Sequence, residues 1–474
     1  MRKSFYITTT LPYVNADPHI GFAMEIIRAD TIARLKRLLG YEVFFNTGSD
    51  EHGQKIYQKA KEKNLDPKTY CDQQVKKFYQ LKEALNLSYD RFIRTTDENH
   101  IKAAQEFWQI SLKNGDIYKA QYQVKYCVGC EMEKTDSELT NGRCPIHPNR
   151  QLEIIEEENY FFRFSKYQQK LLDFYEKNKD FIKPEFRFYE LKNFVKKGLK
   201  DFSISRLKEK MPWGIPVPDD KTQVMYVWFD ALINYISTLG WPKNKKNFEK
   251  FWPGIQIAGK DNLRQQGAMW QAMLMSVNLP PSKQIFIEGF ITSGGQKMSK
   301  SLGNVVDPFL MVKKYGTDAL RFYLLKEIPN FEDGDFSETR MKEIYQSLLA
   351  NELGNLVTRL TNLGEKDKII FSPPKNEEVK KILLSLTIFL DNFQFNQAVN
   401  SLWQEIKNLN KKIDNFAPWQ KSIKKRKSFL ERSIKELYFI AIKLEPFLPN
   451  TAKILMKNLT GQVKKIPPLF PKIK

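Results

Sequence analysis

The chain has 474 residues, more than one hydrophobic core normally supports, and its 42% hydrophobic and 13% aromatic content excludes a disordered protein. Its 76 basic and 55 acidic residues give a net charge of +21, which favours a polyanionic partner, nucleic acid before a membrane surface. A lysine-rich composition without a binding role is the alternative. No run reaches the roughly 18 apolar residues of a membrane span, no leader precedes the first expected strand, and four cysteines exclude a disulfide scaffold, so we expect a cytoplasmic protein.

The N-terminal segment has the strand–helix–strand order of a parallel α/β sheet. Residues 4–9 predict a buried strand, and residues 42–45 predict the next one. Between them the pattern predicts a helix with Asp17 as N-cap and Pro18 at its first position, ending at Gly40. Such an order indicates right-handed crossovers within one sheet.

The remaining chain divides into a turn-rich part, a second α/β part and a helical end. Further strands are expected at residues 224–227 and 284–287, and helices only from about residue 346. Residues 351–474 hold 23 basic and 11 acidic residues, so more than half of the net charge lies there. We therefore predict these boundaries: 1–115, α/β domain, first half; 116–222, insertion; 223–325, α/β domain, second half; 326–345, linking segment; 346–474, helical domain.

Residues 19–22, His-Ile-Gly-Phe, open the first long helix directly after the first strand. Backbone N–H groups at a helix N-terminus, with the helix dipole behind them, suit a phosphate group. Gly21 would let a nucleotide approach the backbone, and His19 would supply a side-chain donor. An ordinary helix start explains the pattern equally well.

Residues 297–301 read Lys-Met-Ser-Lys-Ser, on a loop framed by Gly294, Gly295 and Gly303. Two lysines and two hydroxyls on such a loop suit a mobile clamp on a triphosphate, where they would stabilise the charge that develops on pyrophosphate. A Walker-type phosphate loop is absent from the sequence. We therefore expect this loop to bind a triphosphate without a P-loop.

Three of the four cysteines lie in a C-x2-C-x13-C-x2-H pattern formed by Cys127, Cys130, Cys144 and His147. Three thiolates and one imidazole in two close pairs suit tetrahedral zinc with no open position, hence a structural site. Unpaired thiols are the alternative. Cys71 stands alone and is expected to be an ordinary buried cysteine.

The two motifs, in this order and far apart, resemble those of the class I aminoacyl-tRNA synthetases. The resemblance implies a Rossmann-like parallel sheet split by a zinc-containing insertion and followed by an all-α anticodon-binding bundle. It implies ATP binding, with Mg²⁺, by His19, Gly21, Lys297, Ser299 and Lys300, of which His19, Lys297 and Lys300 would serve catalysis. The family's first motif ends in a second histidine, where this chain has Phe22, which cannot donate a hydrogen bond.

Residues 10–15, 47–53 and 226–235 further resemble the methionine-specific members of that family. The resemblance implies that Asp50 binds the α-ammonium group of methionine, a pairing that charge also favours. The implied methionine-binding residues are Leu11, Tyr13, Asp50, Trp228, Ala231, Tyr235 and Gln266. Sulfur–aromatic contact favours a thioether there, although such aromatics are more often simply core. The family has a histidine where this chain has Gln266, which still donates and accepts hydrogen bonds.

Residues 351–359 and 417–419 resemble the start and a later connection of the anticodon-binding domain. The resemblance implies that Asn355, Arg359 and Trp419 read the CAU anticodon, and an amide, a guanidinium and an indole suit base edges and stacking. The basic residues among 421–427 would lie beside the tRNA backbone.

The resemblance implies a methionine–tRNA ligase that activates L-methionine with ATP and charges tRNA(Met), including the initiator. A monomer is expected, because the chain ends soon after the helical domain. Two alternatives stay open: a catalytically weakened tRNA-binding paralogue, and a class I synthetase for another apolar amino acid. The latter relatives usually carry a large editing domain, for which the insertion looks too short.

Overall fold

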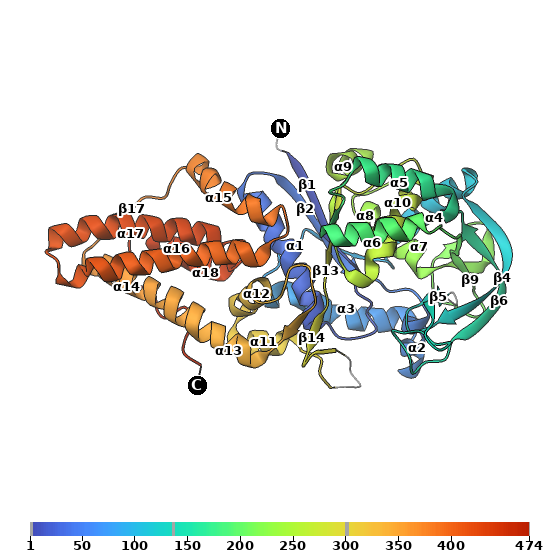
Figure 1. Cartoon of the computed structure of the whole chain (residues 1–474), viewed down its shortest axis with the longest axis horizontal. Helices are drawn as coiled ribbons and strands as arrows, with labels where there is room; N and C mark the ends of the chain where they lie inside the picture. The colour runs from blue at the N-terminus through green and yellow to red at the C-terminus, as the bar shows by residue number, and fades with distance from the viewer. Residues whose placement is uncertain (1–2, 135–137, 299–302, 474) are drawn as a thin grey trace.

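The computed structural model describes residues 3–134, 138–298 and 303–473, without the side chains of residues 122–124, 133, 155 and 297. Figure 1 shows a helical bundle at one end of the long axis, a parallel sheet in the middle and a curved antiparallel sheet at the other end. In this view the N-terminus lies above β1 near the middle of the long axis, and the C-terminus lies below the helical bundle. The architecture is the expected α/β fold with an all-α C-terminal region.

The central sheet has six strands in the order β3-β2-β1-β12-β13-β7, all parallel. Its strands are β1 (Ser4–Thr9), β2 (Glu42–Ser49), β3 (Arg91–Arg94), β7 (Ile182–Lys183), β12 (Ile255–Gly259) and β13 (Gln284–Glu288). The strand order reverses at β1, which has β2 on one side and β12 on the other. In sheets of this kind, ligands bind at the carboxyl ends of the strands beside such a reversal.

Both faces of this sheet are covered, and each contributes to a separate hydrophobic core. Along β1, Phe5 and Ile7 join the core shared with the helical bundle, whereas Tyr6 joins the core on the other side. In β13, Phe286 joins the first core and Ile285 the second. Alternating side chains point to opposite faces of a strand, so a run of apolar residues seals both sides.

The first crossover helix, α1 (Ile20–Leu38), begins later than the sequence predicts. His19, not Asp17, is its N-cap, and the His19 Nδ1 atom accepts a hydrogen bond from the Gly21 backbone N–H at 3.1 Å. Asp17 instead forms an exposed ion pair with Lys77 at 2.7 Å. The prediction was wrong because an imidazole took the capping role that the Asp-Pro pair usually signals.

The next crossover, from β2 to β3, is also helical and comprises α2 (Gln54–Glu62) and α3 (Pro67–Ala84). After β3, α4 (Glu98–Lys113) leads out of the central sheet. Asp66 caps α3 by accepting from the Thr69 N–H at 3.0 Å, with Pro67 at the first helical position.

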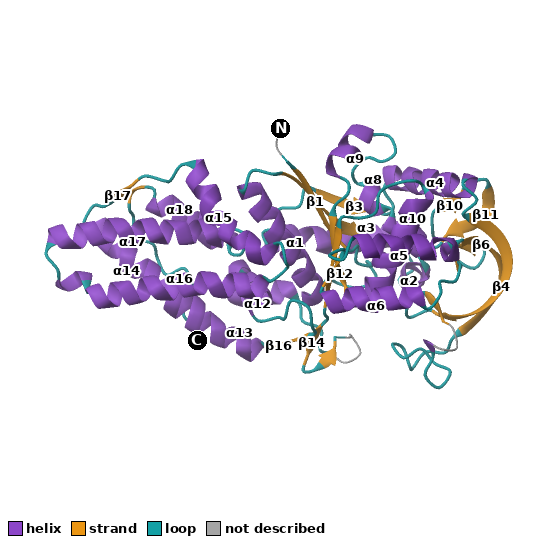
Figure 2. Cartoon of the chain, turned by 45° about the horizontal axis from the view of Figure 1, so that its top comes forward, coloured by secondary structure: helices purple, strands orange, loops and turns teal. Residues whose placement is uncertain are grey.

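The segment after α4 forms the curved antiparallel sheet visible in Figure 2, with the order β5-β4-β6-β8. Its strands are β4 (Ile117–Cys127), β5 (Met132–Lys134), β6 (Glu153–Phe162) and β8 (Phe202–Ser203), and the helices α5 (Gln168–Lys177) and α6 (Glu185–Lys196) follow β6. Between these two helices β7 pairs with β13, so this segment also adds an edge strand to the central sheet.

The expected return to the parallel sheet at residues 224–227 is not found there. Those residues end β11 (Asp220–Met225), which is the middle strand of an antiparallel sheet with β9 (Ser205–Leu207) and β10 (Pro216–Val217), and begin α7 (Val227–Leu232). Only the second half of β11 is buried, whereas an inner parallel strand is buried along its length. The strand that rejoins the sheet is β12.

The second α/β part is mostly helical between its strands. Its elements are α8 (Asn234–Ser237), α9 (Lys245–Phe251), a π-helical turn (Gln265–Met269), α10 (Trp270–Ser276), α11 (Pro308–Tyr315), α12 (Thr317–Lys326) and α13 (Glu338–Ile344). A small sheet of β14 (Ile291–Ser293), β15 (Gln296–Lys297) and β16 (Gly334–Phe336) precedes α13.

The C-terminal region is a helical bundle with one short pair of strands. A π-helix (Tyr345–Gly354) leads into α14 (Asn355–Lys366), α15 (Asn376–Leu390), α16 (Phe395–Phe416), α17 (Ile423–Leu444) and α18 (Pro449–Leu459). Two-residue strands β17 (Ile370–Phe371) and β18 (Gly461–Gln462) pair with each other, a detail that the helices-only prediction missed.

A fully buried arginine ties the bundle to the α/β part. Arg321 in α12 pairs with Asp30 of α1 at 2.9 Å and donates to the carbonyls of Leu85, Pro446 and Phe447. These groups come from α1, the end of α3 and the turn before α18. A planar guanidinium with several fixed donors suits such a junction.

We expect Arg321→Met to lower the free energy of unfolding by about 3–5 kcal/mol, because it leaves buried carbonyls and part of the Asp30 charge without their partner. Arg340→Met is the matched control, since Arg340 is half exposed and pairs with Glu327 and Glu343 on the surface. Arg340→Met should lower the free energy of unfolding by less than about 1 kcal/mol. Denaturant unfolding followed by circular dichroism measures both, and equal losses would contradict the role of Arg321.

Candidate functional site

The first motif lies at the carboxyl end of the central sheet, at the N-terminus of α1. Because the His19 Nδ1 atom accepts from the Gly21 N–H, the neutral ring carries its proton on Nε2 and can donate from there. A Cβ at Gly21 would lie 2.9 Å from His19 Cε1, so glycine is needed for this ring position. Phe22 is buried and packs edge-on against Phe78, with ring centroids 5.7 Å apart. Phe22 therefore belongs to the hydrophobic core.

The second motif follows a tight hairpin of β14 and β15. Gly294 and Gly295 both have positive φ, and Asp335 holds the turn by accepting from Thr292 Oγ1 at 2.6 Å and from the Gly295 N–H at 2.8 Å. The backbone of Lys297 pairs with Thr292 in β15. Ser299 and Lys300, predicted to contact ATP, lie outside the described residues, and the Lys297 side chain does too.

Asp50 directly follows β2 and is 5% exposed. Its backbone N–H donates to the Pro12 carbonyl at 3.0 Å, and its carbonyl accepts from the Val14 N–H at 3.4 Å, so the segment with Leu11 and Tyr13 lies beside it. Among the described residues its carboxylate accepts one hydrogen bond, from the His52 backbone N–H at 3.5 Å, and has no cationic partner. Burial, followed by the charges of nearby carboxylates, raises the pKa of Asp50 well above its ordinary value.

The predicted aromatic residues Trp228 and Tyr235 come from α7 and α8. Tyr235 is buried, and its hydroxyl accepts from Gln266 Nε2 at 2.6 Å, while Gln266 Oε1 accepts from Gln256 Nε2 at 3.2 Å. Burial raises the pKa of Tyr235, and the charges of Glu25 and Asp50 add to the rise. The Trp228 Nε1 atom is buried without a hydrogen-bond partner in the described structure. Within the described ranges the Nε1 atoms of Trp108, Trp270 and Trp403 are buried without a partner as well, so this feature is not specific to Trp228.

Several further polar residues of this region were not singled out from the sequence. Glu131 accepts from the Tyr13 hydroxyl and from the Lys55 N–H at 3.0 Å, and its backbone carbonyl accepts from the Tyr226 hydroxyl. Glu25 accepts from the Thr10 N–H at 2.7 Å and its hydroxyl at 2.6 Å. Burial, then repulsion from Glu288, raises the pKa of Glu25. The sequence feature that could have drawn attention to Glu131 is its place directly after the predicted metal ligand Cys130.

Two of the chain's four histidines form a second buried cluster that the sequence did not reveal. Asp230 lies between His52 Nδ1 at 2.7 Å and His100 Nε2 at 2.8 Å, and His100 Nδ1 lies 2.9 Å from Ser237 Oγ. Burial opposes ionisation of Asp230, but the two imidazoles keep its pKa below the ordinary value. Asp230 and His52 both lie inside motifs used above, and the scarcity of histidine could have drawn attention to His100.

The four predicted metal ligands are brought together, and they fit zinc. Their ligand atoms all lie within 4.8 Å of one another, with Cys130 Sγ 3.4 Å from Cys144 Sγ and 3.3 Å from His147 Nδ1. Tetrahedral zinc–sulfur and zinc–nitrogen bonds place ligand atoms about 3.6–3.8 Å apart. A Cβ at Gly129 would lie 2.4 Å from His147 Cγ, so the loop is shaped around this ring. The cluster could therefore hold a metal ion whose four coordination positions are all filled by protein ligands.

Two of the three predicted anticodon residues, Arg359 and Trp419, are in contact, and Asn355 lies one turn before Arg359 on α14. The Arg359 guanidinium lies 5.2 Å from the centroid of the Trp419 ring and forms an ion pair with Asp414 at 2.5 Å. Trp419 is 51% exposed, and Asn355 is exposed one turn before Arg359 on α14. An exposed indole beside a guanidinium offers a platform for an unstacked base.

The basic run after Trp419 divides into two roles. Arg426 forms two hydrogen bonds of 2.6 Å to the Asp367 carboxylate, so it holds α17 to the end of α14. Arg426 thus has an internal partner, whereas the expected place of the run beside a polyanion stays a prediction. The exposed members of the run are Lys421, Lys424, Lys425 and Lys427.

In the described ranges, no helix is both long and apolar enough to span a membrane. This agrees with the sequence, in which no apolar run approaches the length of a span.

Comparison with known proteins gives one consistent family. The family model "tRNA synthetases class I (M)" matches residues 5–154 and 137–361. The methionine–tRNA ligase of Thermotoga maritima is 41% identical, over 97% of this chain and 76% of the relative, and that of Thermosynechococcus vestitus is 42% identical, over 98% and 91%. A structure of Mycobacterium tuberculosis methionyl-tRNA synthetase in complex with methionyl-adenylate superposes with a TM-score of 0.91, at 34% identity and over 99% of both chains. The chain therefore belongs to the methionyl-tRNA synthetase family of class I aminoacyl-tRNA synthetases.

Proposed function

We propose that this chain activates L-methionine with ATP and transfers it to the 3′ end of tRNA(Met), initiator and elongator alike. The observation that carries the proposal is Asp50, a buried carboxylate without a cationic partner among the described residues, whose backbone pairs with that of Tyr13. The names of the relatives fit the same substrate.

Methionine recognition follows from the chemistry of the predicted pocket. The α-ammonium group pairs with Asp50, because an ion pair satisfies a buried carboxylate that otherwise resists ionisation. The thioether side chain contacts Trp228 and Tyr235, since sulfur packs well against aromatic rings. Gln266 fixes the Tyr235 hydroxyl by donating to it. The remaining pocket residues are Leu11, Tyr13 and Ala231.

Activation needs positioning and charge stabilisation, and no protein nucleophile. The methionine carboxylate attacks the α-phosphorus of ATP, supplied as its magnesium complex, and pyrophosphate leaves. His19 donates from Nε2 to the phosphates, and Gly21 permits their close approach to the helix N-terminus. Lys297, Ser299 and Lys300 bind the departing pyrophosphate. The terminal ribose hydroxyl of tRNA then attacks the carbonyl of methionyl-adenylate.

The bundle supplies tRNA recognition through the CAU anticodon. Trp419 stacks on a base, while Asn355 and Arg359 bind base edges. Arg359 must first exchange its ion pair with Asp414 for the base. The exposed lysines of residues 421–427 contact the phosphate backbone, so their contribution falls with rising salt.

We assign residues 1–115 and 223–325 to the catalytic domain, 116–222 to the insertion, 326–345 to the link and 346–474 to the anticodon-binding domain. The metal is structural zinc, supported by the thiolate-rich ligand set. Cysteines without disulfides support a reducing compartment, the cytoplasm. A monomer is the proposed unit, because one chain contains all the sites named above.

ATP–pyrophosphate exchange across a panel of amino acids tests the proposal. We expect methionine to stimulate exchange. For leucine, isoleucine and valine, kcat/KM in this reaction should be at least about a hundredfold lower, since they lack the thioether. Lys300→Ala is the control for the loop, and it should slow methionine-dependent exchange by about a hundredfold or more while tRNA binding persists.

Two results would contradict this function. Exchange stimulated by another apolar amino acid would reassign the substrate, and exchange stimulated by none, with tRNA still bound, would indicate a tRNA-binding paralogue.

Zinc content tests the metal assignment separately. The purified chain should contain about one zinc per molecule, and Cys130→Ala/Cys144→Ala should retain almost none, since two of four ligands are lost. The double variant should also bind methionine more weakly, because Glu131 follows Cys130 and accepts from Tyr13. Cys71→Ala, a buried cysteine outside the cluster, is the matched control and should keep its zinc. Unchanged zinc content in the double variant would refute the assignment.

A further inference from the structure

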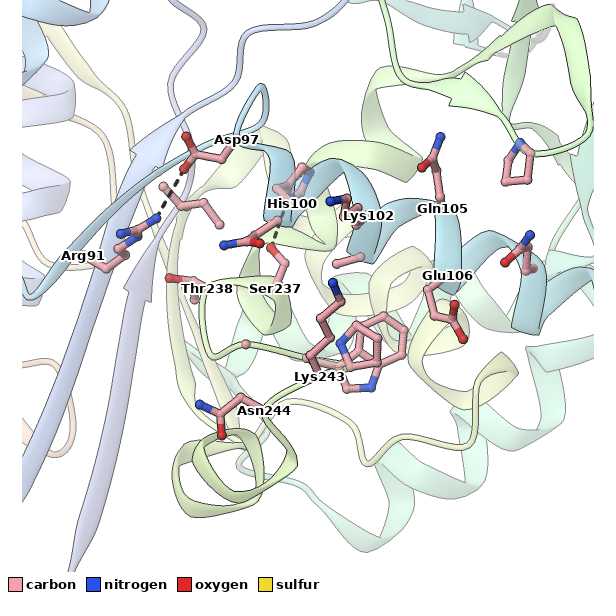
Figure 3. Close-up of a pocket in the computed structure, with 18 of the residues that line it drawn as sticks. Arg91, Asp97, His100, Lys102, Gln105, Glu106, Ser237, Thr238, Lys243 and Asn244 are labelled. Carbon is pink, nitrogen blue, oxygen red and sulfur yellow. Dashed lines mark hydrogen bonds and ion pairs between the residues drawn. The ribbon is translucent and has the colours of Figure 1, made fainter.

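Helix α8 contributes to two separate parts of the structure. Its last residue, Ser237, and the adjoining Thr238 line the cavity of about 850 Å³ drawn in Figure 3. Arg91 and Asp97 line the same cavity and pair with each other at 3.5 Å, so its charge favours no single class of ligand. Tyr235, by contrast, is not among the residues that line this cavity, and its hydroxyl joins a buried row of amide groups.

Four buried polar side chains extend in a row from the Tyr235 hydroxyl. They come from β12, the π-helical turn, α10 and the connection before β13, and each is at most 3% exposed: Gln256, Gln266, Gln271 and Ser282. In the described chain no carboxylate, amine or imidazole bonds to them, so their bonds do not depend on a protonation state. Gln266 lies in the π-helical turn, a feature that is frequent at functional sites.

Two backbone groups fix the orientation of the Gln271 amide. The Ser282 backbone N–H can only donate, and it lies 2.9 Å from Gln271 Oε1. The Gln266 backbone carbonyl can only accept, and it lies 2.7 Å from Gln271 Nε2. Exchange of the amide oxygen and nitrogen would set donor against donor at one end and acceptor against acceptor at the other. The Gln271 amide is therefore fixed, and its Nε2 atom also donates to Ser282 Oγ at 3.2 Å.

The fixed amide sets the direction of the bonds that follow. Because Gln271 donates to Ser282 Oγ, the Ser282 hydrogen is left to donate onward, and Gln256 Oε1 accepts it at 2.7 Å. Gln256 Nε2 then donates to Gln266 Oε1 at 3.2 Å, and Gln266 Nε2 donates to the Tyr235 hydroxyl at 2.6 Å. With the Gln256 amide reversed, the Ser282 hydrogen would have no acceptor in the described structure, which is costly for a buried donor.

The Tyr235 hydroxyl is thereby an acceptor towards the protein and a donor away from it. Its oxygen receives the Gln266 hydrogen, and its own hydrogen has no acceptor among the described residues. The Tyr235 side chain is only 2% exposed. Among the side-chain atoms of methionine, the thioether sulfur is the one that can accept this hydrogen, as a weak acceptor.

We propose that Ser282 and Gln256 keep the Tyr235 hydroxyl turned as a donor to the substrate sulfur, and so set selectivity against amino acids of the same size that lack sulfur. Ser282 and Gln256 are positioning residues in this scheme, since they act through Gln266 and Tyr235. No covalent bond forms or breaks, and no proton leaves its oxygen or nitrogen. The inference rests on the proposed function, in which the thioether contacts Tyr235.

Norleucine, with a methylene group in place of the sulfur, isolates this effect. It has about the volume of methionine but offers no acceptor, so it would leave the Tyr235 hydrogen unpaired in a buried site. A site that donates a hydrogen bond to its substrate rejects an analogue that leaves the donor unpaired.

The Ser282 hydroxyl is what holds the row in this direction. Without it, the amides of Gln256 and Gln266 can both turn over. The Tyr235 hydroxyl can then donate to Gln266 Oε1 and no longer needs an acceptor on the substrate. Norleucine would leave no donor unpaired in that case, whereas methionine would lose one hydrogen bond.

Ser282→Ala tests this in pyrophosphate exchange driven by methionine and by norleucine. We expect the ratio of the two kcat/KM values to fall by about three- to tenfold, the factor that one such hydrogen bond contributes, mainly because norleucine is used better. KM for ATP should change little. Gln256→Met interrupts the row one position further along and should move the ratio in the same direction. A parallel loss of both activities, with the ratio unchanged, would show a structural role and contradict the inference.

Ser276→Ala is the matched control. Ser276 is 2% exposed and bonds to the Met273 carbonyl at 2.7 Å and to Ser111 Oγ at 2.9 Å, outside the row. This variant should leave the methionine-to-norleucine ratio unchanged, whatever its effect on thermal stability.

Tyr235→Phe completes a double-mutant cycle, because it removes the hydroxyl through which Ser282 acts. In that background Ser282→Ala should have no further effect on the ratio. Calorimetric titration of both amino acids supplies the ratio of affinities for variants that turn over slowly.

An unchanged ratio in Ser282→Ala, or the same fall of the ratio in the Tyr235→Phe background, would overturn the inference. Neither result affects the proposed function as long as the wild-type chain exchanges pyrophosphate with methionine. Absence of that exchange in the wild type would instead refute the proposed function.

Discussion

The need to compensate buried carboxylates governs the carboxyl edge of the central sheet. Asp50 and Glu51 follow β2, and Glu288 ends β13, all of them at least 95% buried. An ionised carboxylate is costly to bury without a partner. Arg94 pairs with Glu51, and Arg28 of α1 pairs with Glu288 at 3.0 Å. Ion pairs between buried carboxylates and arginines therefore make up much of the structure around the site.

Asp50 stands apart because its partner is expected from outside the chain. Parallel strands direct their carboxyl ends to one edge, where β1 marks the reversal of strand order and α1 presents its N-terminus. Methionine brings an ammonium group for Asp50 and a carboxylate for the α-phosphorus of ATP. The same edge thus places the amino acid beside the helix end that suits phosphates. The metal cluster lies at one flank, where Glu131 connects it to this edge through Tyr13. The bundle lies at the other flank, where Arg321 ties it to α1 through Asp30.

Much of this organisation could be predicted from the sequence, and the exceptions have physical causes. Strand and helix periodicity located β1, α1 and β2, and ligand spacing located the metal cluster, because these depend on short stretches of chain. The His52–Asp230–His100 cluster could not be predicted, since it is formed by three segments that only the folded sheet brings together. The prediction of a parallel-sheet strand at residues 224–227 was wrong, because β11 pairs antiparallel outside the main sheet. Phe22, which cannot donate a hydrogen bond to ATP, packs in the core against Phe78.

The role of Asp50 is tested most directly by calorimetric titration of methionine into Asp50→Asn, which keeps the shape and removes the charge. The account predicts at least about a hundredfold weaker methionine binding, with ATP binding and thermal stability close to those of the wild type, since a charge-assisted contact to the ammonium is lost. Burial of Asp50 without a cationic partner even predicts a slightly more stable apo protein. Methionine affinity equal to that of the wild type would contradict the assignment of Asp50 as the ammonium ligand.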